Sequence, residues 1–548
     1  MSYLNLMLAI VVVRGIDDRP EGGLADDSAA SAMRRAVESQ LAEGRVGSAL
    51  LAAQRSISEN PDDASVRREF VSLHLSLARE LIRVEDFATA DRALAAIRAV
   101  DANAAEAGRL AGRIGAARRA TPSTVAKADR WMTVEWFDPA FRAYGQAVAL
   151  LPGREPEWRD RYLDAAVGAG DDNYFTKNFH EAFYRYDAAM QLYEKDGRPA
   201  TGRLKSRWLQ SMIHALSDDI DRVGYPPAYW KIVLGRVERA GSAVEMPAMY
   251  RWTVRGLALE DMGETGRAAE AYGRVSGRPV SDASREGLAR VRASAIKRIR
   301  GAYDKSSSDR RRGVWSEQDR GPWQVLEVGR FRIHHRNEGS ARRLADALEF
   351  QFVRIAAILG RTPDEVPWAR PCDVHLHADS RAFREATEQE GLVQAISVIR
   401  TRGANLESHV IHGSQDDPLL LSSSMPHELS HLMVGALTGY RPMPGALAEG
   451  LALHVEPRCR QIQFARVFSR LTRSRSVRAL LRVGEFHPSE SAFYAESHRL
   501  VAVLSGHGDV GLILELHRSG DNRVELARRF GFKSAGALDR AYLGRKAR

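Results

Sequence analysis

The spacing of apolar residues divides the chain into a long helical part and a shorter part that also contains strands. From about residue 31 to residue 300, apolar residues recur with the period of an amphipathic helix in one segment after another. Similar segments repeat here, and each joins a turn to a helix with alanines and larger apolar residues on one face. Corresponding positions in these segments are Val46, Phe87, Phe137, Phe179 and Thr265, at successive steps of 41, 50, 42 and 86 residues. The pattern predicts consecutive helical hairpins that share a core.

Residues 301–322 interrupt this pattern, and a different one follows. Serines, three consecutive arginines and a glycine there are typical of a solvated linker. Beyond it, the pattern predicts a hairpin or long strand at 325–334 and a helix at 341–359 that ends at Gly360. The next predicted elements are a strand at 372–377, a helix containing Phe383 and a strand at 408–412, after which the chain is helical. A small sheet followed by helices indicates an α+β domain.

The helix after these strands carries candidate metal ligands. His427 and His431 are four residues apart, so on an α-helix both imidazoles project from one face and can bind one zinc ion. Glu428 is rotated by about 100° around the helix from His427. There its carboxylate can hold a water on the metal and act as a general base. Such a short motif also arises by chance, so it does not establish a site alone.

The next segment supplies a third candidate ligand. Glycine and prolines at 439–444 break the helix, and a second helix is predicted at 447–455. If that helix runs back alongside the first, it brings Glu449 to the two histidines. Three protein ligands and one open position are typical of catalytic zinc, whereas structural zinc sites have four protein ligands.

The region from about 325 to 520 resembles the gluzincin metallopeptidases, and most closely the peptidase MA-like domains. The resemblance rests on the His-Glu-Leu-Ser-His motif at 427–431 and on the segment at 444–452 that contains Glu449. A strand at 331–335 and a helix at 493–497 also match. The resemblance implies a zinc-dependent hydrolase that cleaves peptide bonds, with His427, His431 and Glu449 binding Zn²⁺ and Glu428 activating the water. Ala446 departs from the family, which usually has tryptophan at this position.

The resemblance implies one further catalytic residue. In gluzincins, a tyrosine or histidine from a helix beyond the ligands commonly donates a hydrogen bond to the oxyanion of the intermediate. Tyr494 matches that position, and His498 is the next candidate because it can share the same helical face. A core tyrosine with a satisfied hydroxyl is the alternative interpretation of Tyr494. For a peptidase, we also expect the strand at 408–412 to be the sheet edge on which an extended protein or peptide substrate pairs.

The repeated helices of the first part resemble the second helix of tetratricopeptide repeats, although their spacing exceeds the 34 residues of that family. The resemblance implies a TPR-like α-solenoid whose concave surface binds a protein partner. The expected fold class is multidomain: an N-terminal all-α TPR-like solenoid at 31–300 and a C-terminal α+β zincin-like metallopeptidase domain at 323–548. An irregular helical domain without a binding role is the alternative for the first part. For the whole chain, the alternative is an adaptor with a catalytically inactive zinc-binding domain.

Composition and charge narrow the range of partners. The 548 residues carry a formal net charge of +10, but the arginines are interleaved with acidic residues, so we expect no nucleic-acid partner. Cys372 and Cys459 lie far apart, which excludes a disulfide scaffold. The apolar stretch within residues 1–30 is too short to span a bilayer. It fits a weak export signal or a buried strand, and therefore an exported, envelope-associated or cytoplasmic protein. We expect no transmembrane span elsewhere.

Two other histidine pairs are weaker metal candidates. His375 and His377 alternate on a predicted strand and face the same way. No third ligand is expected near them, so two histidines on an exposed strand face are the favoured interpretation. His334 and His335 are adjacent on a strand, point to opposite faces and cannot bind one ion together.

Overall fold

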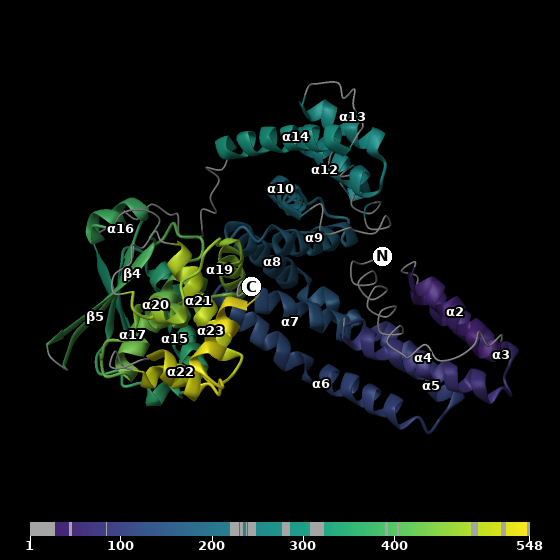
Figure 1. Ribbon diagram of the computed structural model, residues 1–548, viewed down its shortest axis with the longest axis horizontal. Coiled ribbons are helices and arrows are strands. Elements are labelled where there is room, and N and C mark those ends of the chain that lie inside the picture. Colours follow the sequence, from purple (N-terminus) through teal and green to yellow (C-terminus); the bar gives the residue numbers. More distant parts are fainter. Residues whose placement is uncertain are drawn as a thin grey trace. The chain divides into compact units, whose positions relative to one another are not determined.

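The computed structural model is mostly helical, with a small mixed sheet of five strands in the C-terminal half (Figure 1). It describes residues 28–42, 46–83, 85–219, 248–276, 285–306, 323–389, 393–402, 405–483, 491–516 and 522–544, with single positions between 230 and 238. The contacts divide the chain into two compact units. The first unit lies within residues 1–129, 138–167 and 186–302, and the second lies within residues 130–137, 168–185 and 303–548.

Among the described residues between 29 and 306, all regular secondary structure is helical. The helices are α2 (Ala29–Ala42), α3 (Val46–Glu59), α4 (Ala64–Arg83), α5 (Phe87–Val100), α6 (Ala105–Thr133), α7 (Phe137–Leu150), α8 (Glu155–Phe175), α9 (Phe179–Lys195), α10 (Gly202–Asp219), α12 (Ala248–Asp261), α13 (Thr265–Ser276) and α14 (Arg285–Ser306). Helix α2 packs on α3, α4 on α5, and α12 on α13. These pairs are the helical hairpins that the pattern predicted.

The five repeated segments form helices that begin at the corresponding positions, and four of these helices follow the same kind of turn. Glu85, Glu135, Lys177 and Gly263 have left-handed backbone angles, and each lies two residues before a helix start. In each turn, the amide of the next residue donates a hydrogen bond to the carbonyl five residues earlier, at the end of the preceding helix. This bond satisfies a carbonyl that a helix end leaves unpaired.

A buried alanine occupies the fourth position of each repeated helix. The five residues are Ala49, Ala90, Ala140, Ala182 and Ala268, and none has any exposed surface. Interiors are close-packed, so a larger side chain at these positions would push neighbouring elements apart. The repeated alanines therefore follow from the close approach of the helices.

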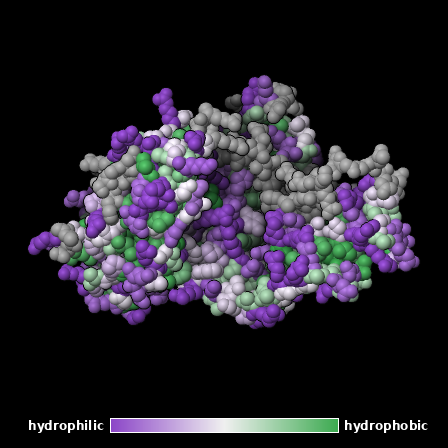
Figure 2. Space-filling model, turned by 60° about the horizontal axis from the view of Figure 1, so that its bottom comes forward, coloured by the Kyte–Doolittle hydropathy of each residue, from purple (hydrophilic) through white to green (hydrophobic). Residues whose placement is uncertain are grey.

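Some predicted segments fall outside the part of the chain that the structure describes. Helix α14 continues to Ser306, so residues 301–306 of the predicted linker are helical. Residues 307–322 and the apolar stretch within residues 1–27 are not among the described residues. Within the described ranges, no helix has both the length and the apolar character needed to cross a membrane. Hydrophilic side chains cover much of the face drawn in Figure 2, and hydrophobic ones form separate patches there.

The sheet has the strand order β1-β2-β3-β5-β4. The strands are β1 (Gln324–Val328), β2 (Phe331–His335), β3 (Cys372–His377), β4 (Ala395–Arg402) and β5 (Asn405–Ser414). β2, β3 and β5 are parallel, whereas β1 and β4 are antiparallel edge strands. The helices of this part are α15 (Glu338–Ile358), α16 (Ser380–Thr387), α17 (Met425–Leu437), α18 (Gly445–Val455), α19 (Arg458–Arg470), α20 (Val477–Leu480), α21 (Ser491–Ser505), α22 (Asn522–Arg529) and α23 (Ala535–Leu543).

One face of the sheet forms a core with helices α15 and α17 (Figure 1). Ile333, Val374 and Ile411 are register neighbours on β2, β3 and β5, and none has any exposed surface. Because side chains alternate along a strand, the residues on either side of these three point to the opposite face. Cys372 and Cys459 are both buried, and neither forms a disulfide.

Most predicted elements of this part are confirmed, but one expectation is wrong. The hairpin is β1 and β2, the helix before Gly360 is α15, and β3 has the predicted bounds. The strand at 408–412 lies within β5, which pairs with β3 on one side and with β4 on the other, so it is not a sheet edge. The edge strand is β4, which the sequence analysis missed. Alternation indicates that a strand exists but carries no information on the order of strands in a sheet.

Candidate metal centre

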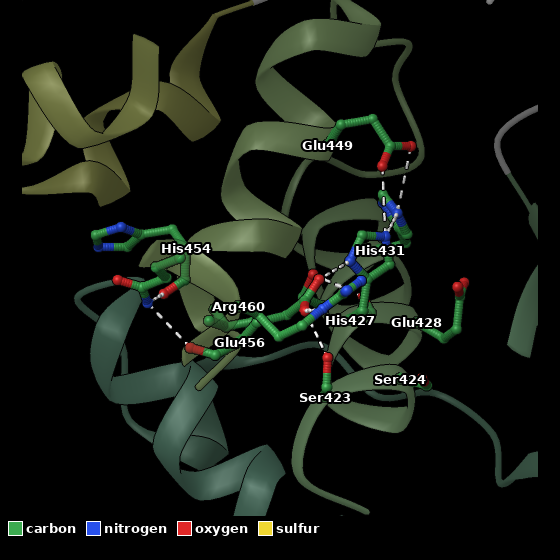
Figure 3. Close-up of polar contacts among 12 residues, drawn as sticks. Ser423, Ser424, His427, Glu428, His431, Glu449, His454, Glu456 and Arg460 are labelled. Carbon is green, nitrogen blue, oxygen red and sulfur yellow. Dashed lines mark hydrogen bonds and ion pairs between the residues drawn. The ribbon is translucent and has the colours of Figure 1, made fainter. Parts of the chain in front are cut away.

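Helix α17 places its two histidines together, as their spacing predicts. Pro426 lies in the first turn, where its missing amide proton costs no helical hydrogen bond. His427 and His431 lie one turn apart, and their Nε2 atoms are 3.2 Å from each other (Figure 3). Two ring nitrogens that face each other at this distance need a shared proton or a shared cation between them, because their lone pairs repel.

The chain then reverses, and α18 returns Glu449 to the histidines. The turn after α17 contains Gly439 and Tyr440, which have left-handed φ angles of 61° and 59°. Glu449 Oε2 lies 3.3 Å from His427 Nε2, and Glu449 Oε1 lies 3.5 Å from His431 Nε2. Across the described ranges, these three residues form the one group of three or more His, Cys, Asp or Glu with all ligand atoms within 4.8 Å of one another.

The spacing of these three donors fits a tetrahedral zinc ion. Bonds of about 2.0–2.1 Å at tetrahedral angles place two ligand atoms about 3.3–3.4 Å apart. The two histidine Nε2 atoms are 3.2 Å apart, and each faces a different oxygen of Glu449, at 3.3 Å from His427 to Oε2 and at 3.5 Å from His431 to Oε1. Glu449 Oε2 is buried and accepts no hydrogen bond of normal geometry from the described residues, so a cation would satisfy it. The side chains of His427, His431 and Glu449 are 15%, 20% and 13% exposed, so the group lies close to solvent.

Glu456 orients the first histidine, and the sequence analysis did not identify it. It follows α18 directly, and its Oε1 accepts a hydrogen bond of 2.8 Å from His427 Nδ1. The proton on Nδ1 leaves the lone pair of Nε2 free for a metal, as is usual for histidine ligands. Ser423 and Arg460 donate to the other oxygen of Glu456 (Figure 3). Burial raises the pKa of Glu456, but Arg460, His427 and Ser423 more than offset this and lower it to about 2.

The charges of the centre favour a cation between the three donors. Burial lowers the pKa of His427, but Glu449 and Glu456 more than offset this and raise it well above its ordinary value. Burial raises the pKa of Glu449, and the two histidines more than offset this and lower it. In the metal-free protein, a proton on His427 therefore supplies the positive charge that the carboxylates require.

Glu428 lies next to this group without joining it. Figure 3 shows its carboxylate beside the two histidines, apart from Glu449 and Glu456. Its Oε2 accepts a hydrogen bond of 2.6 Å from Ser397 Oγ. Ser397 is on β4 and is the register partner of Ile411, so it points to the face of the sheet that α17 covers. The edge strand thus holds the carboxylate in place.

Helix α21 packs against α18 and brings Tyr494 near the centre. The close approach depends on Gly450, where a Cβ atom would lie only 2.6 Å from the carbonyl oxygen of Ser497. Burial raises the pKa of Tyr494, and the carboxylates of Glu449 and Glu428 raise it further. The Tyr494 side chain therefore lies within electrostatic reach of the proposed ligand and base. His498, one turn on, is buried, and burial together with His454 lowers its pKa to about 4.

The residues that sequence reasoning missed here are Glu456, Ser397 and Arg460. Glu456 follows Glu449 by seven residues, which is two helical turns, and that spacing was a signal for a carboxylate near the histidines. Ser397 offered no such signal, because its role depends on which strand forms the sheet edge. Comparison of the chain with protein-family models and with curated proteins finds no match.

Proposed function

We propose that this chain is a zinc-dependent metallopeptidase. The observation that carries the proposal is the group of His427, His431 and Glu449, whose donor separations suit one tetrahedral zinc ion. Three protein ligands leave one coordination position open, as in catalytic sites. Glu428 is a carboxylate next to this position that is not a member of the donor group. A site with a ligand set and a separate base is suited to hydrolysis.

In such a reaction, each of these residues of the chain has a different role. Bound zinc supplies a Lewis acid that polarises the substrate carbonyl and makes water more acidic. Glu456 fixes the ring of His427, so the donor group is preorganised. Glu428, held by Ser397, takes the proton of the attacking water and passes it to the leaving amine. Tyr494 donates a hydrogen bond to the oxyanion that develops on the substrate.

Strand β4 replaces β5 as the proposed docking edge for the substrate. Among the described strands it pairs with β5 alone, and its C-terminal half is exposed. An extended peptide can add to such an edge through main-chain hydrogen bonds, which depend little on side chains. Ser397 on this strand contacts Glu428, so a peptide that pairs with β4 passes close to the base. The helical hairpins of the first part, which we propose to be TPR-like repeats, would bind a protein partner.

Zinc analysis and a cleavage assay on one preparation test this proposal. The protein purified without chelator should contain one zinc ion per chain and should cleave an unfolded protein. A chelator should stop cleavage, and added zinc should restore it. Protein that binds one zinc ion but cleaves neither unfolded proteins nor peptides would instead be the zinc-binding adaptor. Protein that does not bind zinc would contradict both hypotheses, the zinc metallopeptidase and the zinc-binding adaptor.

Replacing Glu456 by Gln should weaken zinc binding by about 10–100-fold, the usual effect of removing a partner that orients a histidine ligand. Gln keeps the size of the side chain but loses the charge that fixes the His427 proton on Nδ1. Competition titration with a fluorescent zinc chelator gives the affinity. Glu349→Gln is the matched control, since Glu349 is a partly buried carboxylate paired with Arg330. Equal zinc affinities for the two variants would show that Glu456 does not support the metal site.

Replacing Tyr494 by Phe should lower kcat by about 10²–10³-fold, because one oxyanion donor is lost while zinc content stays the same. Tyr440→Phe is the control, since it also removes one hydroxyl, which contacts His409 rather than the metal ligands. A loss of less than threefold, with zinc retained, would make Tyr494 a core residue. His498 would then be the next donor to test.

A further inference from the structure

A second group of imidazoles lies on the face of the sheet opposite to the candidate metal centre. His334 on β2 pairs in register with His375 on β3, which pairs with His412 on β5. Each of the three alternates with a buried core residue, so the row lies on the face that α15 and α17 do not cover. The rings are stacked, with centroids 4.3 Å apart between His334 and His375 and 4.8 Å apart between His375 and His412.

His377 completes the group, two residues further along β3. Its Nε2 lies 3.1 Å from His412 Nδ1. This separation is close to the one between the Nε2 atoms of His427 and His431, which is 3.2 Å. The centroid of the His375 ring is 4.8 Å from that of His412 and 6.5 Å from that of His377, and this ring would have to rotate about its side-chain bonds for a third nitrogen to join the pair. In this conformation His412 lies beside His377, but no three donors that include His375 and His377 lie within 4.8 Å of one another among the described residues, as the sequence predicts.

The imidazoles of this face have free lone pairs at neutral pH. Burial and the neighbouring imidazoles lower the pKa of His375 and of His377 to about 4. Burial and His334 lower the pKa of His412 as well. Neutral imidazole is the form that binds metals, so protons do not compete for these nitrogens near pH 7.

Charged groups beside this face have opposing effects on the binding of a cation. Asp373 Oδ1 lies 2.9 Å from His334 Nε2, and the negative charge of Asp373 favours the binding of a cation. Asp373 Oδ1 also pairs with Arg332, whose Nη1 lies 3.3 Å from it, and this positive charge weakens the attraction of Asp373 for a cation. Arg336 is a neighbouring positive charge of His377 and disfavours a cation, but its guanidinium lies over the ring of Trp323, 5.0 Å from the centroid. The histidines must therefore supply most of the binding energy.

We propose that His377 and His412 bind one late first-row transition-metal ion, with His375 turning in as a third ligand. Imidazole nitrogen suits Cu²⁺, Ni²⁺ and Zn²⁺, and the general order of affinities places Cu²⁺ first. This second site lies on the other face of the sheet from Glu428 and does not depend on the proposed peptidase function. The proposed chemistry of this site is metal binding alone.

A copper titration tests the site in a chain whose first site has been removed. The background variant carries His431→Ala and Glu449→Ala, which leave one candidate ligand at the first centre. This protein should bind one Cu²⁺ per chain in equilibrium dialysis, and electron paramagnetic resonance should show at least two nitrogen ligands. Adding His377→Gln and His412→Gln should weaken this binding at least tenfold. His507→Gln, which removes an exposed histidine elsewhere, should have no effect.

Tryptophan fluorescence locates the ion without altering any histidine of the second group. The ring centroid of Trp323 is 5.7 Å from that of His377 and 6.1 Å from that of His375, close enough for bound Cu²⁺ to quench it. Stoichiometric Cu²⁺ should therefore quench part of the fluorescence in the background variant, and Trp323→Phe should remove that part. Unchanged quenching in Trp323→Phe, or copper with a single nitrogen ligand, would overturn the proposal. Both measurements keep the histidine pair intact, so they remain decisive if the glutamine variants fail to fold.

Discussion

Replacing Glu428 by Gln is expected to abolish peptide hydrolysis while the protein keeps its fold and its zinc. Gln has the size of Glu and can keep a hydrogen bond with Ser397, but it cannot accept the proton of the attacking water. Removal of a general base typically lowers kcat by about 10²–10⁴-fold. Glu428 is outside the donor group, so the zinc content should stay at one ion per chain.

The measurement is kcat on a quenched fluorescent peptide, together with zinc analysis of the same sample. Glu338→Gln is the control, since Glu338 is an exposed carboxylate on α15 that pairs with Arg342. If Glu428→Gln cleaves as fast as the wild type, Glu428 is not the base. If Glu428→Gln loses zinc together with activity, its carboxylate acts in metal binding, and the division between ligands and base is wrong.

Local features of the chain were predictable because they depend on residues close in sequence. The four-residue spacing of His427 and His431 fixes one helical face, and the structure confirms that the rings meet. The return of Glu449 was also predictable, since the breaking residues at 439–444 permit little except a reversal between two short helices. The repeated helices were predictable, because the same alanine recurs in all five and the same turn precedes four of them.

Features that depend on strand order or on distant pairing were not predictable. Whether β4 or β5 forms the edge depends on how the hairpin of these two strands joins the sheet, and the sequence of neither strand specifies this. The contact between Ser397 and Glu428 follows from that order. In the same way, His412 meets His377 only because β5 lies beside β3, so the second imidazole group could not be derived from the spacing of His375 and His377.

Replacing Glu449 by Ala is expected to remove zinc from the protein. The variant keeps two histidines on one helix, but the third donor and its negative charge are lost. Its zinc affinity should fall further than the roughly 10–100-fold expected for a residue that only orients a ligand. Zinc at about 1,000 times the wild-type Kd should stabilise the wild type by about 4 kcal/mol. A thousandfold loss of affinity would leave less than about 1 kcal/mol of that stabilisation.

The informative quantity is the change in Tm on adding zinc, rather than the Tm of each protein alone. The pKa of Glu449 is lowered in the folded, metal-free protein, so its charge stabilises that state above its unfolded pKa, and this contribution fades as pH falls through the folded pKa. At pH 7, Glu449→Ala should therefore be somewhat less stable than the wild type even without zinc. With Glu349→Ala as control, the wild type and the control should both gain Tm with zinc, whereas Glu449→Ala should gain almost none. An unchanged zinc-induced gain in Glu449→Ala would mean that another residue supplies the third ligand, and α18 would then have no part in the metal site.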